Sequence, residues 1–167
     1  MAAARSFPPI AAPGAHTLVL GSLPGRESLR QGQYYAHPRN AFWRIIGQVF
    51  GAGELPRYEQ RIELLTMHGV ALWDVLAGAE RPGSLDASIV HESARANDFG
   101  AFFRGHRAIR RVFFNGQTAM QMYRRLVLPS VGPEYADIRY ECLPSTSPAH
   151  AGMPFAEKLV RWQRIRE

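Results

Sequence analysis

Short apolar segments alternate along this chain with longer segments whose apolar residues recur at a helical spacing. Four runs rich in β-branched and aromatic residues have the length of strands and end near Gly, Pro or Asn, at residues 16–20, 70–75, 109–114 and 138–143. These runs are apolar at nearly every position. We therefore expect strands that are covered by helices on both faces of one sheet.

Between the strands, apolar positions follow the 3.6-residue period of a helix. Residues 42–50 and 58–65 carry such faces, and Gly69 is expected to stop the second helix. Asn97 is placed to cap a short helix with three phenylalanines. The last helix, from about residue 154, is expected to pack through its aromatic residues and to carry a basic face on its other side.

Strands that alternate with helices predict an α/β fold with a parallel sheet and crossover connections. A chain of 167 residues allows about one domain. We assign residues 16–167 to it and interpret the proline-rich residues 1–15 as a flexible N-terminal arm. Ligand sites in such sheets lie beyond the carboxyl ends of the strands. This rule selects four loops, at residues 21–40, 73–86, 115–117 and 144–153.

Composition removes several classes of protein. Hydrophobic residues make up 46% and charged residues 20%, as in globular chains. The formal net charge of +6 suits a polyanionic partner, although it also serves solubility alone. A single cysteine, Cys142, excludes a disulfide framework, and we expect it to be an inert core thiol. No histidine pair has metal-binding spacing and no apolar run has the length of a membrane span, so we expect neither a metal nor a membrane.

The first loop opens with a turn directly after a strand, Gly21-Ser22-Leu23-Pro24-Gly25. Glycine lets the backbone approach a ligand closely, and successive amides can cradle an oxygen. An ordinary tight turn accounts for the same residues equally well. The phosphate-loop ending and the three-glycine dinucleotide pattern are both absent.

The second half of this loop crowds polar and aromatic side chains together. Tyr35, His37 and Asn40 lie within six residues. A stacking ring beside imidazole and amide groups is what a nucleobase pocket needs. The alternative is that Pro38 begins a helix and the aromatic rings pack, and for Tyr34 we expect packing. In the last loop, small hydroxyl residues at 145–147 can contact phosphates or simply cap the helix that follows.

Six segments, taken in order, resemble the uracil-DNA glycosylase superfamily, and most of all its hypoxanthine-DNA (deoxyinosine) glycosylase branch. They are GSLPGRESLRQGQYYAHPRNAFW, GVALWDVL, RPGSLDASI, NDF, VFFNG and LPSTSPA. The resemblance implies a three-layer sandwich around a central four-stranded parallel sheet. It implies a monofunctional enzyme that hydrolyses the N-glycosidic bond of a flipped deaminated base, chiefly hypoxanthine, without metal or cofactor. It also implies a monomer that acts on double-stranded DNA, in the cytoplasm with access to the chromosome.

The chain departs from the superfamily pattern at two places. Leu23 stands where many members carry an Asp or Asn that deploys water, and a hydrocarbon cannot do that work. The resemblance to the deoxyinosine branch implies that Asn40, in the segment HPRN, takes the catalytic part. His150 stands where this branch commonly has an asparagine.

For this reaction, we assign roles to further residues from their expected positions. Asp74 accepts from N1–H of the base, or else serves as a structural cap or in an ion pair. Asn115 supports the pocket, or else forms the turn before Gly116, and residues 149–153 wedge into the gap left by the flipped base. The base pocket comprises Gly21, Ser22, Leu23, Pro24, Gly25, Tyr35, His37, Asp74 and Asn115. The DNA-binding set comprises Arg39, Ser145, Thr146, Ser147, Ala149, His150, Met153, Lys158 and Arg161.

Other functions fit parts of the pattern. The preferred base could be uracil, xanthine or a mismatched base instead of hypoxanthine. Because Leu23 lacks polar chemistry, a non-catalytic nucleic-acid-binding module on the same fold is an alternative from another class. An enzyme acting on free nucleosides would have little use for a basic surface, since a free nucleoside has no phosphate chain to contact.

Overall fold

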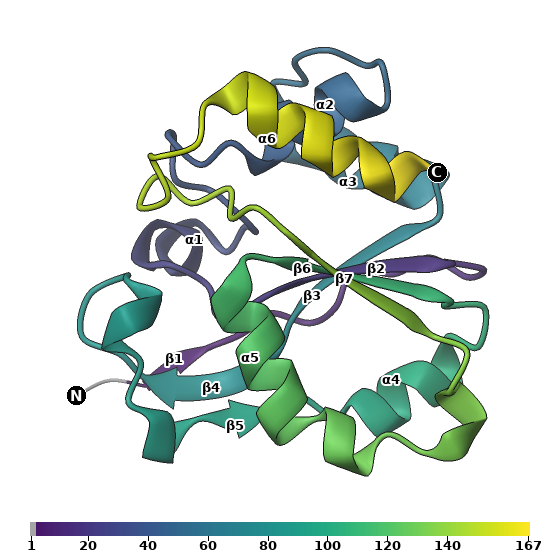
Figure 1. Cartoon of the computed structure of the whole chain (residues 1–167). Coiled ribbons are helices and arrows are strands. Elements are labelled where there is room, and N and C mark those ends of the chain that lie inside the picture. Colours follow the sequence, from purple (N-terminus) through teal and green to yellow (C-terminus); the bar gives the residue numbers. More distant parts are fainter. Residues whose placement is uncertain (1–2) are drawn as a thin grey trace.

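A four-stranded parallel sheet with the order β3-β2-β6-β7 forms the centre of the computed structural model, which describes residues 3–167 (Figure 1). The strands are β2 (Thr17–Gly21), β3 (Val70–Asp74), β6 (Arg111–Asn115) and β7 (Arg139–Leu143). The predicted strands are confirmed, with ends that shift by one or two residues. All residues of β2 and β3 are buried, as continuous apolar runs require.

Helices cover both faces of this sheet and create two apolar cores. Figure 1 shows α2 (Phe42–Val49), α3 (Tyr58–Met67) and α6 (Phe155–Trp162) on one face, and α4 (Phe99–Gly105) and α5 (Gln117–Leu126) on the other. Side chains alternate along each strand, so Val19 belongs to the first core while Leu18 and Leu20 belong to the second. The predicted three-layer arrangement is confirmed.

A second, antiparallel sheet joins the N-terminal residues to the body of the protein. It contains β1 (Ala3–Arg5), β4 (Leu76–Glu80) and β5 (Arg95–Ala96). Farther along, Ile10 exchanges backbone hydrogen bonds with Leu72, and the indole N–H of Trp73 donates to the carbonyl of Phe7 at 3.0 Å. Within the segment expected as a flexible arm, residues 3–5 are therefore paired with β4 and Ile10 is paired with β3, because the edges of these strands offer backbone partners.

The end of α3 and the start of α4 each have a defined backbone arrangement. Gly69 follows α3 with a φ of 69°, in the left-handed region that suits glycine, and the predicted stop is confirmed. The predicted cap of α4 is wrong by one residue: Asp98, not Asn97, accepts the backbone N–H of Ala101 at 3.0 Å. The Asn97 amide instead donates to the carbonyl of Asp74 at 2.7 Å and so braces the end of β3.

The short helix α1 (Arg26–Gln31) lies at the carboxyl edge of the parallel sheet (Figure 1). The loops that leave β2, β3, β6 and β7 all reach this edge. None of the helices in the described part of the chain is both long and apolar enough to span a bilayer.

Candidate functional site

A cavity of about 790 Å³ opens at the carboxyl edge of the sheet, where the four loops selected by the sequence meet. Every predicted site residue lines it except Lys158. The predicted residues brought together are Gly21, Ser22, Leu23, Pro24, Gly25, Tyr35, His37, Arg39, Asn40, Asp74, Asn115, Ser145, Thr146, Ser147, Ala149, His150, Met153 and Arg161.

Gly21 allows two polar side chains to approach the backbone at the end of β2. A Cβ atom at this position would lie 2.5 Å from Asp74 Oδ1 and 2.7 Å from the hydroxyl of Tyr35. Both distances are shorter than real Cβ contacts, so any larger residue would displace these groups. The glycine thus serves the close approach of an acid and a phenol, in addition to the turn that follows.

Those two side chains hold the only buried polar side-chain atoms in residues 3–167 that lack a hydrogen-bond partner, Tyr35 Oη and Asp74 Oδ2. An unpartnered buried polar atom costs free energy, and such atoms are rare in folded proteins. Asp74 forms no ion pair within these residues, so the ion-pair alternative is not what the structure contains. Both residues line the cavity.

The carboxyl of Asp74 is 3% exposed, and its surroundings alter its protonation. Burial, followed by the nearby charge of Asp86, raises its pKa to about 7, while Arg81 opposes the shift. Asp74 therefore titrates near neutral pH, and perturbed groups of this kind concentrate at functional sites.

Tyr35 has a strained backbone and a fixed ring. Its φ of 54° is the one positive value for a non-glycine residue in the described chain. The ring packs on Phe42 with centroids 4.2 Å apart. Tyr34, by contrast, is buried and donates its hydroxyl to the carbonyl of Pro8 at 2.9 Å, which confirms the expected packing role.

The oxygen and nitrogen atoms of the Asn40 carboxamide have different surroundings. Its Oδ1 accepts the backbone N–H of Phe42 at 2.9 Å, at the entry to α2. Its Nδ2 donates to no group of residues 3–167, and the residue lines the cavity. The backbone around it is tied to the last loop, because the N–H of Ala41 donates to the carbonyl of Thr146 at 3.0 Å.

Asn115 and Thr146 lock the third and fourth loops together. The Asn115 amide donates to Thr146 Oγ1 and accepts the Thr146 backbone N–H, both at 2.9 Å. Thr146 is only 1% exposed, so the predicted phosphate contact is corrected to a structural one for this residue. Ser145 and Ser147 are half-buried in the lining, and each accepts a backbone N–H two residues ahead.

Lys158 is the predicted DNA-binding residue that the structure removes from the surface. It is 5% exposed, and its ammonium donates to the carbonyl of His150 at 2.7 Å. Lys158 therefore anchors the tip of the last loop, residues 149–153, through this hydrogen bond. Arg161, on the same helix, has an exposed side chain and does line the cavity.

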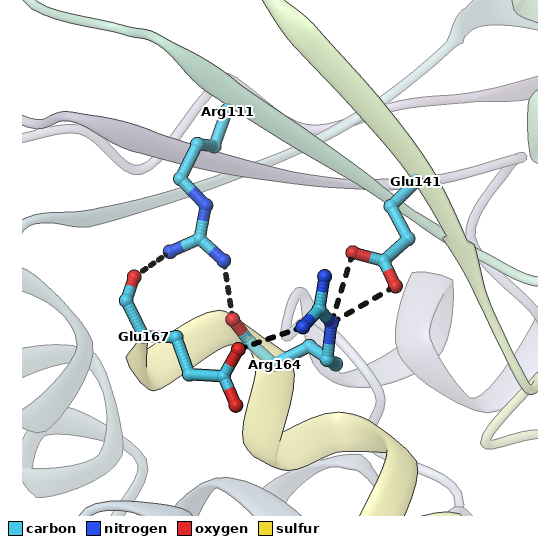
Figure 2. A network of polar contacts seen from close by, with 4 residues as sticks. All are labelled: Arg111, Glu141, Arg164 and Glu167. Carbon is cyan, nitrogen blue, oxygen red and sulfur yellow. Dashed lines mark hydrogen bonds and ion pairs between the residues drawn. The ribbon is translucent and has the colours of Figure 1, made fainter.

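Arg164, expected on the same basic face, belongs to a network away from the cavity (Figure 2). Its guanidinium donates to Glu141 at 3.1 Å and to Glu167 at 2.7 Å. Arg111, the first residue of β6, donates to the backbone carbonyls of Arg164 and Glu167. This network joins the amino end of β6 to the end of the chain.

Sequence reasoning missed two charged residues that shape the first loop. Arg81 is 6% exposed and donates to the backbone carbonyls of Pro24 and Gly83. Asp86 accepts the hydroxyl of Ser22 at 2.7 Å. Burial lowers the pKa of Arg81 and raises that of Asp86. Both residues lie in the segment RPGSLDASI, which carried part of the family resemblance but was given no role.

Metal-binding side chains do not gather within residues 3–167, where no group of three or more His, Cys, Asp and Glu residues is placed to hold an ion. Cys142 is half-buried and lines the cavity, and burial raises the pKa of its thiol. What the cavity offers a ligand is thus an unpartnered acid, a phenol and an amide, between backbone turns.

Comparisons with known proteins agree with this arrangement. The model of the Uracil DNA glycosylase superfamily matches residues 8–166. A Hypoxanthine DNA glycosylase from Methanosarcina barkeri is 37% identical over 114 residues, which cover 68% of this chain and 71% of that one. Another, from Methanosarcina acetivorans, is 36% identical over 135 residues, which cover 75% and 84%.

A solved structure shares the whole fold. It is the solution NMR structure of a protein from Methanosarcina acetivorans that is described as a candidate uracil DNA glycosylase. The TM-score is 0.79 at 30% identity, and the superposition covers 99% of this chain and 100% of the other.

Proposed function

This chain belongs to the uracil DNA glycosylase superfamily, and from that premise we propose that it excises hypoxanthine from DNA. The observation that carries the proposal is the pair of buried, unpartnered polar atoms on Tyr35 and Asp74, in a cavity that Asn40 also lines. The names of two relatives, both Hypoxanthine DNA glycosylases, support the choice of base.

Excision breaks the bond between N9 of the base and C1′ of the deoxyribose. The bonding electron pair leaves with the base, which takes up a proton. A water oxygen bonds to C1′ and gives up a proton. The enzyme can accelerate this reaction by holding the nucleotide outside the duplex, stabilising the charges that develop and placing the water.

Asp74 selects the base in this proposal. Hypoxanthine presents an N1–H donor, which an ionised carboxylate accepts, whereas adenine presents a lone pair at N1 and is repelled. The approach allowed by Gly21 sets the carboxylate at the backbone of the first loop, and Tyr35 supplies the aromatic surface for stacking. Specificity then includes a repulsive element against the undamaged base.

Asn40 supplies the catalytic polar group. Leu23, which stands at the usual position, is 7% exposed and packs in the apolar core on the side of α4 and α5. Asn40 keeps its Nδ2 available while its Oδ1 fixes the side chain at the helix entry. A neutral amide suits a dissociative reaction, because the water then needs positioning more than deprotonation.

The DNA backbone is held by hydroxyl and cationic groups around the cavity. Ser145, Ser147, Arg39 and Arg161 line it and can contact phosphates without reading sequence. Lys158 is the only lysine of the chain, and its ammonium is occupied by His150. Water, and not a lysine amine, is therefore the nucleophile. We place the enzyme in the cytoplasm, as a monomer acting on double-stranded DNA with a deaminated base.

The test is single-turnover excision from matched duplexes that carry one deoxyinosine, deoxyuridine or deoxyxanthosine, in the presence of EDTA, with alkali cleavage afterwards. We expect the deoxyinosine duplex to be cut fastest. Faster excision of uracil or xanthine would change the assigned base. DNA binding without excision of any of the three would favour the non-catalytic binding module.

A further inference from the structure

Tyr35 keeps its strained backbone next to a residue that is fixed through several polar groups. A φ of 54° costs free energy in a non-glycine residue, and such a conformation persists only where the surrounding structure holds it. The backbone N–H of Tyr34 donates to the hydroxyl of Tyr58 at 3.1 Å, and its carbonyl accepts the indole N–H of Trp43 at 2.7 Å. Both bonds restrain the chain where it enters the strained residue.

The third polar group of Tyr34 connects it to the N-terminal segment. Its hydroxyl donates to the carbonyl of Pro8 at 2.9 Å, and its ring meets the edge of the Phe7 ring with centroids 5.2 Å apart. Pro8 is exposed, whereas the Tyr34 side chain is buried. The residue that precedes Tyr35 is thus tied to a part of the chain that the sequence predicted to be a flexible arm.

The same segment also fixes the backbone around Asp74. The indole N–H of Trp73, the preceding residue, donates to the carbonyl of Phe7 at 3.0 Å. The amide of Asn97 donates both to Ser6 Oγ at 3.2 Å and to the carbonyl of Asp74 at 2.7 Å. Asp74 is therefore linked to the N-terminal segment through its neighbour's side chain and, by way of Asn97, through its own carbonyl.

These contacts converge on Tyr35 and Asp74, the two residues with unpartnered buried polar atoms. We call residues 6–10, which make the contacts, the N-terminal brace. The brace residues do not line the cavity, so they act on both side chains from outside it. Such support matters for a reaction, because a misplacement of about 1 Å can lower a rate about a hundredfold.

We propose that the N-terminal brace positions Tyr35 and Asp74 for binding the flipped base. This inference rests on the proposed function, in which Tyr35 stacks on the base and Asp74 accepts its N1–H. The brace contacts no part of the substrate. It favours base binding by ordering both side chains before the base arrives, so that less ordering remains to be done on binding.

The test compares binding of two duplexes by Tyr34→Phe, which removes one hydroxyl from the brace contact and keeps the ring. One duplex carries 2′-fluoro-deoxyinosine, whose fluorine slows loss of the base, and the other carries a tetrahydrofuran abasic site. Affinity for the inosine duplex should fall roughly three- to tenfold, the scale of one lost hydrogen bond, and affinity for the abasic duplex by less than about twofold.

Ser6→Ala tests the contact with Asp74, because it removes one acceptor of the Asn97 amide. It should lower affinity for the inosine duplex by about two- to fourfold and leave that for the abasic duplex unchanged. Tyr123→Phe is the matched control for Tyr34→Phe. Tyr123 is a buried tyrosine outside the cavity lining, and its hydroxyl bonds that of Tyr140 at 3.1 Å, so the variant should bind both duplexes as wild type does.

Three outcomes would overturn the inference. An equal loss of affinity for both duplexes in Tyr34→Phe would make the brace a general support of the fold. Unchanged affinity for the inosine duplex would remove the brace from base binding. A loss in Tyr123→Phe that matches the one in Tyr34→Phe would show that any missing buried hydroxyl has this effect.

Hydrogen exchange without DNA separates this inference from the proposed function. The backbone N–H of Ala36, directly after Tyr35, donates to Ser28 Oγ at 3.1 Å. Its exchange should be faster in Tyr34→Phe than in wild type and unchanged in Tyr123→Phe. If this difference is present but wild type excises no deaminated base, the brace still positions Tyr35 and only the proposed function fails. If wild type excises deoxyinosine but Tyr34→Phe changes neither exchange nor binding, only the brace fails.

Discussion

Polar groups at the two ends of the parallel sheet differ in burial and in hydrogen bonding. At the carboxyl end, Tyr35 and Asp74 are buried and leave polar atoms without partners. At the amino end, Arg111 and Glu141 are half-buried and Arg164 and Glu167 are exposed, yet these groups bond to one another and to backbone carbonyls (Figure 2). The exposed groups could have been satisfied by water, whereas the buried ones could not.

This contrast separates structure from function more clearly than charge does. Both ends contain charged residues, and the sequence predicted a basic face on the last helix without separating Arg161 from Arg164. A group whose partners are all within the chain supports the fold. A buried polar group that has no hydrogen-bond partner in the chain serves a function other than folding. Substitutions at the carboxyl end should therefore change activity, and those at the amino end should change stability.

Substitutions of Asn40 test this difference most directly, because its Oδ1 bonds within the fold and its Nδ2 does not. Asn40→Ala should cut single-turnover excision by roughly a hundredfold or more, the scale of losing one preorganised polar group. It should also cost about 1 kcal/mol of stability, since the N–H of Phe42 loses its acceptor.

Asn40→Ser separates the two effects. A serine hydroxyl at this position can still accept the backbone N–H at the helix entry, but it carries no amide. We expect near-normal melting and a large loss of excision. Near-normal excision by the serine variant would reduce Asn40 to a cap.

Asp74→Asn should give the next largest effect, a change in how the excision rate depends on pH. The pKa of about 7 lies above the usual carboxyl range because of burial, with Asp86 adding to the shift and Arg81 opposing it. If the ionised form accepts N1–H, excision of hypoxanthine by wild type should rise with pH through about 7. Asp74→Asn should lose that rise and fall about tenfold below wild type at pH 8, an effect measured by pH–rate profiles.

The same shift has a consequence for stability, with the opposite sign from an ordinary ion-paired acid. The folded protein binds the Asp74 proton more tightly than the unfolded chain does. Wild-type stability should therefore decline as pH rises from about 4 to about 7. Thermal melts of Asp74→Asn should show a shallower decline in that window. Parallel melting curves for the two proteins would contradict the assigned burial.

The smallest effects compare two arginines of the C-terminal region. Arg161→Ala should weaken binding to all DNA sequences about three- to tenfold and lower the slope of log affinity against log salt by about one. Arg164→Ala should lower the melting temperature slightly and leave DNA affinity unchanged, because it loses Glu141 and Glu167. Equal losses of DNA affinity in both variants would erase the distinction between the two ends.

The sheet and its loops were predictable because parallel strands leave a strong signal. Buried strands are apolar at every position, so β2 and β3 stand out, and the carboxyl-edge rule then places Gly21, Asp74 and Asn115 together without any contact information. The small sheet gave no such signal. Strand β1 is three residues long, and β4 carries a glycine and two alanines, which pattern analysis does not distinguish from loop.

The missed side chains show what spacing alone does not convey. Lys158 lies four residues before Trp162 and so shares its packed helical face, yet its charge suggested solvent. Only the carbonyl of His150, brought close by the fold, makes burial of the ammonium tolerable. Arg81 and Asp86 lie among Gly, Pro and Ser in what resembles a solvated loop. Their partners in the first loop are distant in sequence and could not be inferred from it.

The order of the strands affects how the protein folds during its synthesis on the ribosome. Strand β2 lies between β3 and β6, and Thr17 pairs with Arg111, from the far half of the chain. During synthesis from the N-terminus, β2 and β3 emerge early, but one edge of β2 stays unpaired until β6 follows. An open apolar edge invites aggregation. The nascent chain is thus most prone to aggregate in that interval, and residues 144–153 form the last of the four lining loops to be synthesised.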